Sequence, residues 1–281
     1  MAYWEAEDSV SRSWSENLLS EVFTLLRSSS SLSSFHFIHY RTDTSLYCKH
    51  LQALVSENPR LETLTVSADG PKFVVIAKAI AVCLSRNTVL KSFTLRIPTL
   101  FYDQKQQSLE ILLRPFTSSS PSEANASIKD LTLYLQYPDG YCVDAISNLL
   151  CRNTTLKNLD LRFPTNLSSW TGFRALASAL QSNTTLRHLQ CIYVLDEYGN
   201  YTLRDDAKNI TDKDSCQVEF QIQEILRTMI DNELRVNTSL ESFVVGHWTL
   251  LRVGIEWRTR YRGPCLREQT GEYNVNVEMT P

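Results

Sequence analysis

Glycine is scarce in this chain. There are 8 glycines in 281 residues, less than half of the usual share of about 7%. Loops that cradle phosphate groups need glycine where the backbone approaches the ligand. The motifs GxxxxGK[ST], GxGxxG, HExxH and GxSxG do not occur either. The sequence therefore predicts a protein that is not an enzyme and that carries no cofactor.

Paired cysteines and long apolar runs are also lacking. The seven cysteines form no CxxC pair and no Cys/His block with zinc spacing. No apolar run reaches the roughly 18 residues of a membrane span, and no basic segment followed by an apolar core opens the chain. The formal net charge of -3 gives no general attraction for nucleic acid or an anionic membrane. We expect a cytoplasmic protein that binds neither membrane nor nucleic acid.

The chain does contain an internal repeat. Seven segments share apolar residues at offsets 0, +3 and +5, and most of them begin 28 to 30 residues apart, with two longer intervals of 38 and 54 residues. The first residues of these segments are Leu32, Leu61, Leu90, Ile128, Leu156, Leu186 and Leu240. The two longer intervals predict insertions near 117–124 and 194–216.

Asparagine recurs three residues before these apolar positions. The first unit has Ser29 in that slot, and the others have Asn58, Asn87, Asn125, Asn153, Asn183 and Asn237. Asparagine tolerates the left-handed backbone conformation that commonly ends a helix. We therefore expect each asparagine to end a helix in that conformation before the chain enters a short strand.

Apolar residues precede most of these slots at helical spacing. Seven, four and three residues before the slot lie, for example, Leu51, Leu54 and Val55. The same count selects Val22, Leu25 and Leu26; Ile80, Cys83 and Leu84; Ile146, Leu149 and Leu150; Leu176, Ala179 and Leu180; and Ile230, Glu233 and Leu234, where only Glu233 is charged. In the fourth unit, Leu109, Leu112 and Leu113 have the same mutual spacing but lie nine residues too early, which places an insertion in 117–124. Cys83 in a helix and Cys191 in a strand are then predicted to be packing residues.

Helix, asparagine turn and short strand form one unit, and neither element can bury its apolar side alone. Stacked units bury both sides in a continuous core. The sequence thus predicts an α/β solenoid, or horseshoe, of about seven helix-strand units with a parallel concave sheet. We expect a repeat domain over 1–249 that begins with a capping helix through Trp14, Leu18 and Val22, and a C-terminal cap and tail over 250–281.

The pattern resembles the leucine-rich repeat proteins of the ribonuclease-inhibitor-like subclass. The run ALASALQSNTTLRHLQC, from Ala175 to Cys191, is similar to its helix-then-strand unit, including the repeats of nucleotide-binding immune receptors. The resemblance implies helices on the convex side and a scaffold whose concave sheet binds a protein. In one respect the chain departs from the family, whose asparagine ladder lies eight residues after the first leucine. Those positions here are Tyr40, Asp69, Pro98, Gln136, Pro164, Val194 and Trp248.

Offsets +2, +4 and +6 should point to the concave face, because strand side chains alternate. The +6 positions of three successive units hold Arg96, Tyr134 and Arg162, residue types enriched at interface hot spots. The other candidate contacts on this face are Asp130, Asp160 and His188. We predict that an unidentified protein partner binds this face or the two insertions, and we expect no small-molecule substrate.

Two other functions stay open from the sequence. One is a GTPase-activating regulator, since one family of that kind uses the same repeat subclass, and Arg96 or Arg162 would then act on a nucleotide in trans. The other is phosphate or RNA binding through the C-terminal tail, where arginines alternate with Trp257 and Tyr261. A terminal cap on the last unit is the simpler explanation of this tail.

Metal binding and glycosylation are not expected. His36 and His39 should point to opposite faces of one strand, and the acidic residues between Asp196 and Asp214 match no calcium loop. Seven N-x-[ST] sequons occur, and four of them contain an asparagine of the repeat. The repeat gives these four asparagines a structural role instead.

Overall fold

The structure, a computed structural model, describes residues 2–6, 16–39, 45–68, 73–97, 105–120, 123–135, 140–164, 172–194, 224, 226–246 and 248–261. Ten strands form one open sheet, and they lie in it in the order in which they occur along the chain. The strands are β1 (Ala2–Ala6), β2 (Ser34–His39), β3 (Thr63–Ala68), β4 (Ser92–Ile97), β5 (Asp130–Leu135), β6 (Asn158–Pro164), β7 (His188–Val194), β8 (Ser242–Val245), β9 (Trp248–Val253) and β10 (Glu256–Tyr261).

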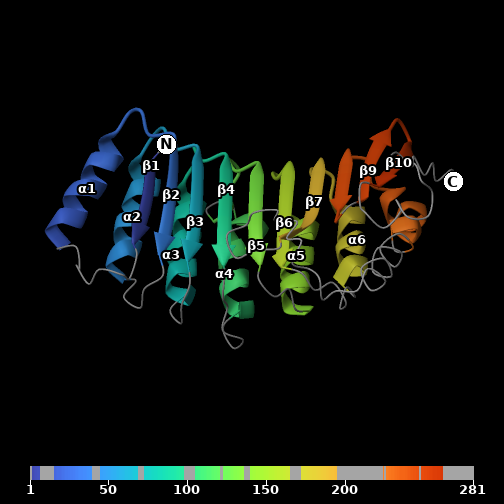
Figure 1. Ribbon diagram of the computed structural model, residues 1–281, viewed down its shortest axis with the longest axis horizontal. Helices are drawn as coiled ribbons and strands as arrows, with labels where there is room; N and C mark the ends of the chain where they lie inside the picture. The colour runs from blue at the N-terminus through green and yellow to red at the C-terminus, as the bar shows by residue number, and fades with distance from the viewer. Residues whose placement is uncertain are drawn as a thin grey trace, which may run out of the picture.

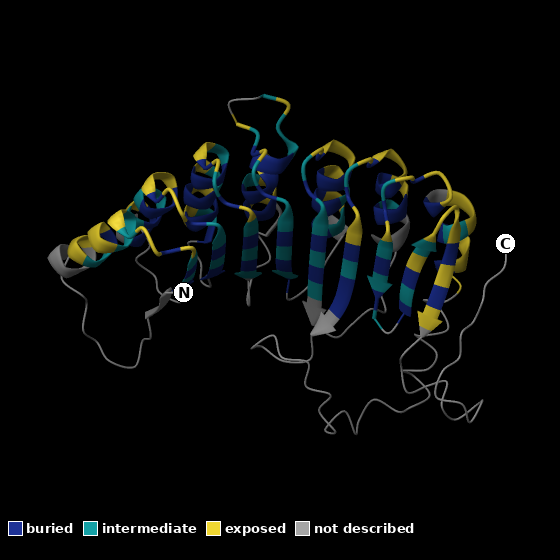
Figure 2. Cartoon of the chain, turned by 90° about the horizontal axis from the view of Figure 1, so that it is seen from above, coloured by how far each residue is buried: buried dark blue, intermediate teal, exposed yellow. Residues whose placement is uncertain are grey.

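Helices connect these strands and cover one face of the sheet (Figure 1). They are α1 (Glu16–Ser28), α2 (Ser45–Glu57), α3 (Phe73–Arg86), α4 (Lys105–Thr117), α5 (Gly140–Arg152), α6 (Gly172–Ser182) and a short π-helix, η2 (Ile230–Leu234). Seen from above, the row of strands curves gently, with the helices on its outer side (Figure 2). No helix of the described residues is long and apolar enough to cross a membrane.

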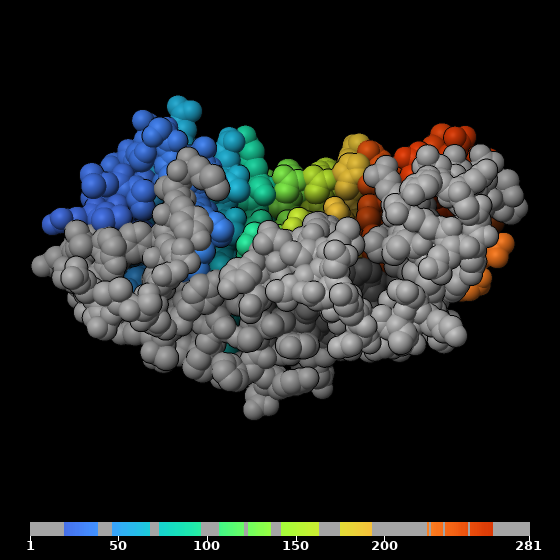
Figure 3. All heavy atoms as spheres, viewed as in Figure 1, coloured from blue at the N-terminus to red at the C-terminus, as the bar shows by residue number. Residues whose placement is uncertain are grey.

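The strands from β1 to β8 pair in parallel, and the predicted repeat sets their register. Phe35, Leu64 and Phe93, each three residues after the first apolar residue of its unit, lie side by side on β2, β3 and β4. The same register continues to β8 across both long intervals. Successive units follow one another along the long axis of the molecule (Figure 3). The coarse prediction of an α/β structure with a parallel sheet is thus confirmed.

The predicted apolar positions form the core between sheet and helices. The first residue of each repeat segment is at most 5% exposed. From α2 to α6 the predicted helix residues are buried as well. In α1 the prediction is wrong for Leu25, whereas Leu26 is partly buried and packs against the core. Leu25 is 71% exposed, and Phe23 is buried in its place. The Phe23 ring packs on Phe35 and stacks on His50, so α1 turns a different side toward the sheet.

The repeat asparagines do not adopt the left-handed conformation that we expected. Among the described residues, only glycines have positive φ. Each asparagine is buried, and its side-chain oxygen accepts hydrogen bonds from main-chain N–H groups two or three residues later in the chain. In the fifth unit, for example, Asn153 Oδ1 accepts from Thr155 at 2.9 Å and from Leu156 at 2.7 Å. The side chain, and not an unusual backbone angle, shapes the turn.

The amide nitrogen of each asparagine reaches back to the preceding unit. Asn153 Nδ2 donates to the Phe116 carbonyl at 2.9 Å, and Asn183 Nδ2 donates to the carbonyls of Leu150 and Asn153. Equivalent bonds start from Asn58, Asn87, Asn125 and Asn237. These asparagines therefore form a hydrogen-bonded ladder between successive units.

An antiparallel hairpin closes the C-terminal end of the sheet. Strand β9 pairs antiparallel with β8, and β10 pairs antiparallel with β9. Trp248 and Trp257 are buried on the helix side, where the indole N–H of Trp257 donates to the Leu234 carbonyl of η2 at 3.4 Å. The hairpin thus seals the last helix-strand unit against solvent.

Candidate functional site

Three neighbouring strands bring the predicted contact residues together on the face without helices. The register places Arg96 of β4 beside Tyr134 of β5, and Tyr134 beside Arg162 of β6. Their neighbours Leu95, Leu133 and Leu161 are buried on the helix side, so alternation directs the three side chains to the other face. This part of the predicted site is a contiguous cluster.

The ring of Tyr134 lies between two guanidinium groups. The central guanidinium carbon of Arg96 is 4.7 Å from the ring centroid, and that of Arg162 is 4.8 Å away. These are distances at which a cation is attracted by the face of an aromatic ring. Arg162 also donates from Nη1 to the hydroxyl oxygen of Tyr134 at 2.5 Å. The two arginines are consequently held in place by the tyrosine before any partner binds.

Asp160 fixes Arg162 from the other side. Nε and Nη2 of Arg162 lie 2.8 Å and 2.7 Å from Oδ2 of Asp160, which is two residues earlier on the same strand. The two side chains are only 24% and 19% exposed. We define the aromatic-arginine cluster as Arg96, Tyr134, Asp160 and Arg162. The sequence placed Asp160 on this face but did not predict its ion pair, because the D-x-R spacing within one strand permits the pair without selecting it.

The aromatic-arginine cluster retains unused hydrogen-bonding capacity. Nε of Arg96 and Oδ1 of Asp160 are both buried, and neither has a hydrogen-bond partner within the described part of the chain. Leaving such atoms unpaired costs free energy. Arg96 also forms no ion pair with a described residue, so its positive charge is available to a ligand.

Asp130 and His188 lie apart from this cluster. Both occupy the +2 positions, where Asp130 accepts a hydrogen bond from Asn158 on the next strand. His188 Nδ1 lies 2.8 Å from the hydroxyl of Ser242, and its Nε2 lies 3.8 Å from a carboxylate oxygen of Glu241. These two predicted contact residues therefore belong to the start of the strands and do not touch the aromatic-arginine cluster.

The described residues only partly meet the requirements of a GTPase-activating regulator or of phosphate or RNA binding by the tail. Arg162 is bound to Asp160 and Tyr134, whereas an arginine acting in trans must reach outward to a nucleotide. Trp257 is 6% exposed and cannot stack on a base from this position. Arg262 and Arg267 of the tail lie outside the described residues, as does nearly all of the insertion near 194–216.

Three of the buried cysteines offer no activated nucleophile. Burial raises the pKa of Cys48 to about 11 and that of Cys83 to about 12, and it raises the pKa of Cys191 further. Such thiols stay protonated at neutral pH, and only the thiolate attacks an electrophile. Cys83 and Cys191 are buried packing residues, as the repeat predicts. Within the described residues, no three His, Cys, Asp or Glu side chains group as metal ligands would.

Comparisons with known proteins assign no family. No protein-family model matches the chain, and no curated protein matches its sequence. Among solved structures, the C-terminal domain of tropomodulin from Caenorhabditis elegans matches 59% of this chain and 92% of its own length, at 11% identity and a TM-score of 0.38. Leiomodin-1 actin-binding site 2 matches 75% of this chain and 95% of its own length, at 16% identity and a TM-score of 0.31. Similarity this low carries no functional inference.

Proposed function

We propose that the chain is a non-enzymatic interaction scaffold, a leucine-rich repeat solenoid of about seven units that binds a protein partner on its concave sheet face. The observation that carries this proposal is the aromatic-arginine cluster. Tyrosine and arginine are enriched among the residues that dominate binding energy at protein interfaces. Here they come from three successive strands and hold one another in place, so little side-chain entropy remains to be lost on binding.

The polarity of the surrounding surface supports a protein ligand. Next to the aromatic-arginine cluster, Thr65, Thr94 and Thr132 lie side by side on β3, β4 and β5, half-buried on the same face. Short hydroxyl side chains leave room for a partner to approach the sheet closely. A central group of aromatic and arginine residues with a polar surround is typical of protein interfaces. Enclosure of a small molecule would need a concave apolar pocket instead.

Affinity capture with mass spectrometry tests the proposal. The full chain, carrying an affinity tag, is compared with the triple variant Arg96→Ala, Tyr134→Ala, Arg162→Ala in lysate of the native source. We expect the wild-type chain to retain a specific protein that the variant loses. The melting temperature of the variant should stay within about 5 °C, because the three side chains lie outside the core.

A second triple variant on the same face serves as the control. Ser34→Ala, Thr63→Ala and Ser92→Ala alter β2, β3 and β4 without touching the aromatic-arginine cluster. Capture should survive these changes. If both triple variants retain the same proteins as the wild type, the proposed binding site is wrong.

A further inference from the structure

A row of basic side chains lies along the edge of the sheet where the helices end and the strands begin. Each member directly follows the first apolar residue of its repeat segment, in four successive units. We define the basic row as Lys91, Lys129, Lys157 and Arg187. It is separate from the aromatic-arginine cluster, whose arginines lie at the +6 positions.

The main chain holds the basic row in line. The N–H of Lys129 donates to the Lys91 carbonyl, that of Lys157 to the Lys129 carbonyl, and that of Arg187 to the Lys157 carbonyl, each at 2.8 Å. Neighbouring strands lie about 4.8 Å apart, so four like charges follow one another at close spacing. Like charges beside each other on adjacent strands destabilise a sheet. A bound anion would relieve this repulsion.

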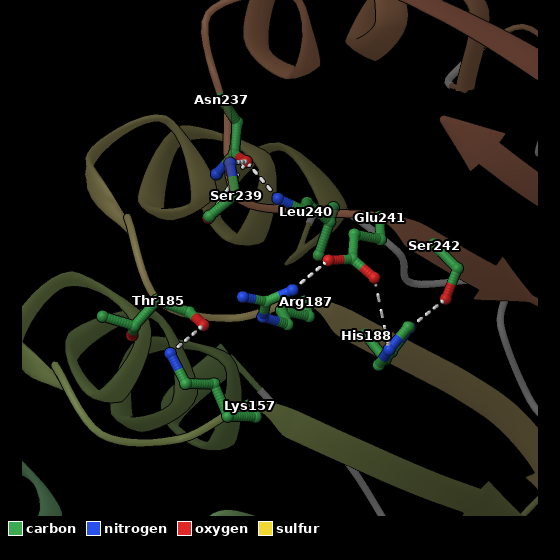
Figure 4. A network of polar contacts seen from close by, with 9 residues as sticks. All are labelled: Lys157, Thr185, Arg187, His188, Asn237, Ser239, Leu240, Glu241 and Ser242. Carbon is green, nitrogen blue, oxygen red and sulfur yellow. Dashed lines mark hydrogen bonds and ion pairs between the residues drawn. The ribbon is translucent and has the colours of Figure 1, made fainter. Parts of the chain in front are cut away.

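Carboxylates neutralise only the two ends of the basic row. Lys91 Nζ lies 2.5 Å from the carboxylate of Glu62. Arg187 pairs with Glu241 at the opposite end, as Figure 4 shows. In each pair both side chains are about half exposed, so the pairs are open to solvent.

The two central lysines have no such partner. Nζ of Lys129 donates to the Ala126 carbonyl at 2.9 Å, and Nζ of Lys157 donates to the Thr185 carbonyl at 3.3 Å (Figure 4). Neither lysine forms an ion pair with any described residue. A main-chain carbonyl orients an ammonium group but does not cancel its charge. The centre of the row is therefore a positioned and uncompensated pair of positive charges.

Arginines behind the row enlarge the positive surface. Arg86, Arg114 and Arg152 lie in the last turns of α3, α4 and α5 and are exposed, and none forms an ion pair with a described residue. The helix dipole favours a cation at that end and explains these arginines in part. It does not explain the basic row, whose members lie beyond the helices. Of the acids in the same units, Glu123 accepts a hydrogen bond from Ser118, and Asp130, which directly follows Lys129, accepts one from Asn158.

We propose that the basic row binds a short acidic segment of a protein partner, with Lys129 and Lys157 as its central contacts. Glu62 and Glu241 bound the row, so it spans only a few strand spacings and would repel a phosphate backbone that continues past either end. No exposed Phe, Tyr or Trp lies on this edge within the described residues, and single-stranded nucleic acid is normally held by stacking on such rings. An acidic peptide needs neither a longer row nor stacking.

Fluorescence anisotropy with a fluorescein-labelled hexaglutamate peptide tests this proposal on the full chain. The variant Lys129→Gln, Lys157→Gln is compared with Arg258→Gln, Arg260→Gln, which removes the same charge from exposed positions on β10. We expect the lysine variant to weaken peptide binding by about fivefold and the arginine variant by less than about twofold. The lysine variant should melt no lower than the wild type, because like-charge repulsion is removed.

Two further measurements complete the test. The variant Glu62→Gln, Glu241→Gln frees both ends of the row and should bind the peptide more tightly than the wild type. If the lysine and arginine variants lose the same peptide affinity, the effect comes from net charge alone and the proposal is overturned. An absence of peptide binding to the wild type would also overturn it. Tighter binding of a short oligothymidylate through the same lysines would assign the row to nucleic acid instead. None of these outcomes depends on Arg96, Tyr134 or Arg162, so the proposed concave site is tested separately.

Discussion

Asn237 donates a hydrogen bond from its side-chain amide to the main-chain carbonyl of Asn183, 2.8 Å away, although 54 residues separate the two. Asn183 makes the same contact to Asn153 at 3.2 Å across 30 residues. The ladder thus connects neighbouring units whatever the length of the chain between them. Both insertions leave it intact, which explains how the sheet keeps one register across unequal intervals.

Removing one rung of this ladder should destabilise the fold. Asn153→Ala deletes a donor to Phe116 and an acceptor for two main-chain N–H groups, all of them buried or nearly so. We expect a loss of about 3 kcal/mol in the free energy of unfolding, measured in urea. Asn148→Ala, at an exposed position of α5, is the matched control and should change it by less than about 0.5 kcal/mol. Similar losses at both positions would rule out a special role for the ladder.

The contact between Tyr134 and Arg162 can be measured without a partner. Tyr134→Leu and Arg162→Met, alone and combined, form a double-mutant cycle on unfolding free energy. We expect a favourable coupling of about 1 kcal/mol from the ring-cation contact and the hydrogen bond. Thr65 and Arg162, on β3 and β6, provide a pair without contact, whose coupling should be near zero. A coupling near zero for the first pair as well would mean that the cluster is not held together before binding.

Burial should determine which cysteines react with a thiol reagent. At pH 8 a maleimide should label exposed Cys151 in the folded chain and spare Cys48, Cys83 and Cys191, whose thiol pKa values burial raises. Peptide mapping by mass spectrometry distinguishes these sites. Rapid labelling of Cys191 without unfolding would contradict its position in the core.

The same raised pKa values predict a dependence of stability on pH. Above the unfolded thiol pKa of about 8.5, the unfolded chain releases protons that the folded chain still holds, so the free energy of unfolding falls as pH rises. For Cys83 the fall should continue until its folded pKa of about 12. Urea unfolding between pH 8 and pH 10 should therefore show a shallower decline for Cys83→Ala than for the wild type. Equal slopes would contradict the predicted linkage.

A destabilising substitution in the C-terminal hairpin should not reduce the stability of the distant strands. Trp257→Ala removes a buried indole that packs near Leu234, and we expect hydrogen exchange to accelerate in η2, β9 and β10 while β3 to β5 keep their protection. Arg260→Gln, on the exposed side of the same strand, is the control and should leave exchange unchanged. Uniform loss of protection after Trp257→Ala would show that the units unfold as a single cooperative block.

The sequence predicted the repeat, the register and most of the core because apolar spacing determines which side of an element is buried. It failed at α1, where Phe23 lies one residue from the expected stripe, because aromatic packing at the end of the array outweighs the repeat pattern. It also placed Arg96, Tyr134 and Arg162 together correctly, since strand alternation and unit spacing were sufficient.

The role of the asparagines could not be derived from the sequence alone. The pattern showed that the position three residues before the first apolar residue of each unit is important. A left-handed turn and a side-chain ladder would both favour asparagine at that position. The structure distinguishes them, because no described non-glycine residue has a positive φ and Nδ2 of the asparagine bonds to the preceding unit. The ion pair of Asp160 with Arg162 was missed because spacing alone does not choose between partners on the same strand and on adjacent strands.

The hairpin at β9 and β10 breaks the pattern of helix-strand units. The chain reverses after β8 and again after β9, so β10 runs parallel to β8, but no described helix of its own covers the hairpin. Arg258 and Arg260 of β10 would meet their own counterparts if two β10 strands paired antiparallel. Whole units could be gained or lost between β2 and β8 at little structural cost, whereas a unit added after β10 would find no described helix of the hairpin to pack against. Length variation among descendants of this chain should therefore be found ahead of Ser242.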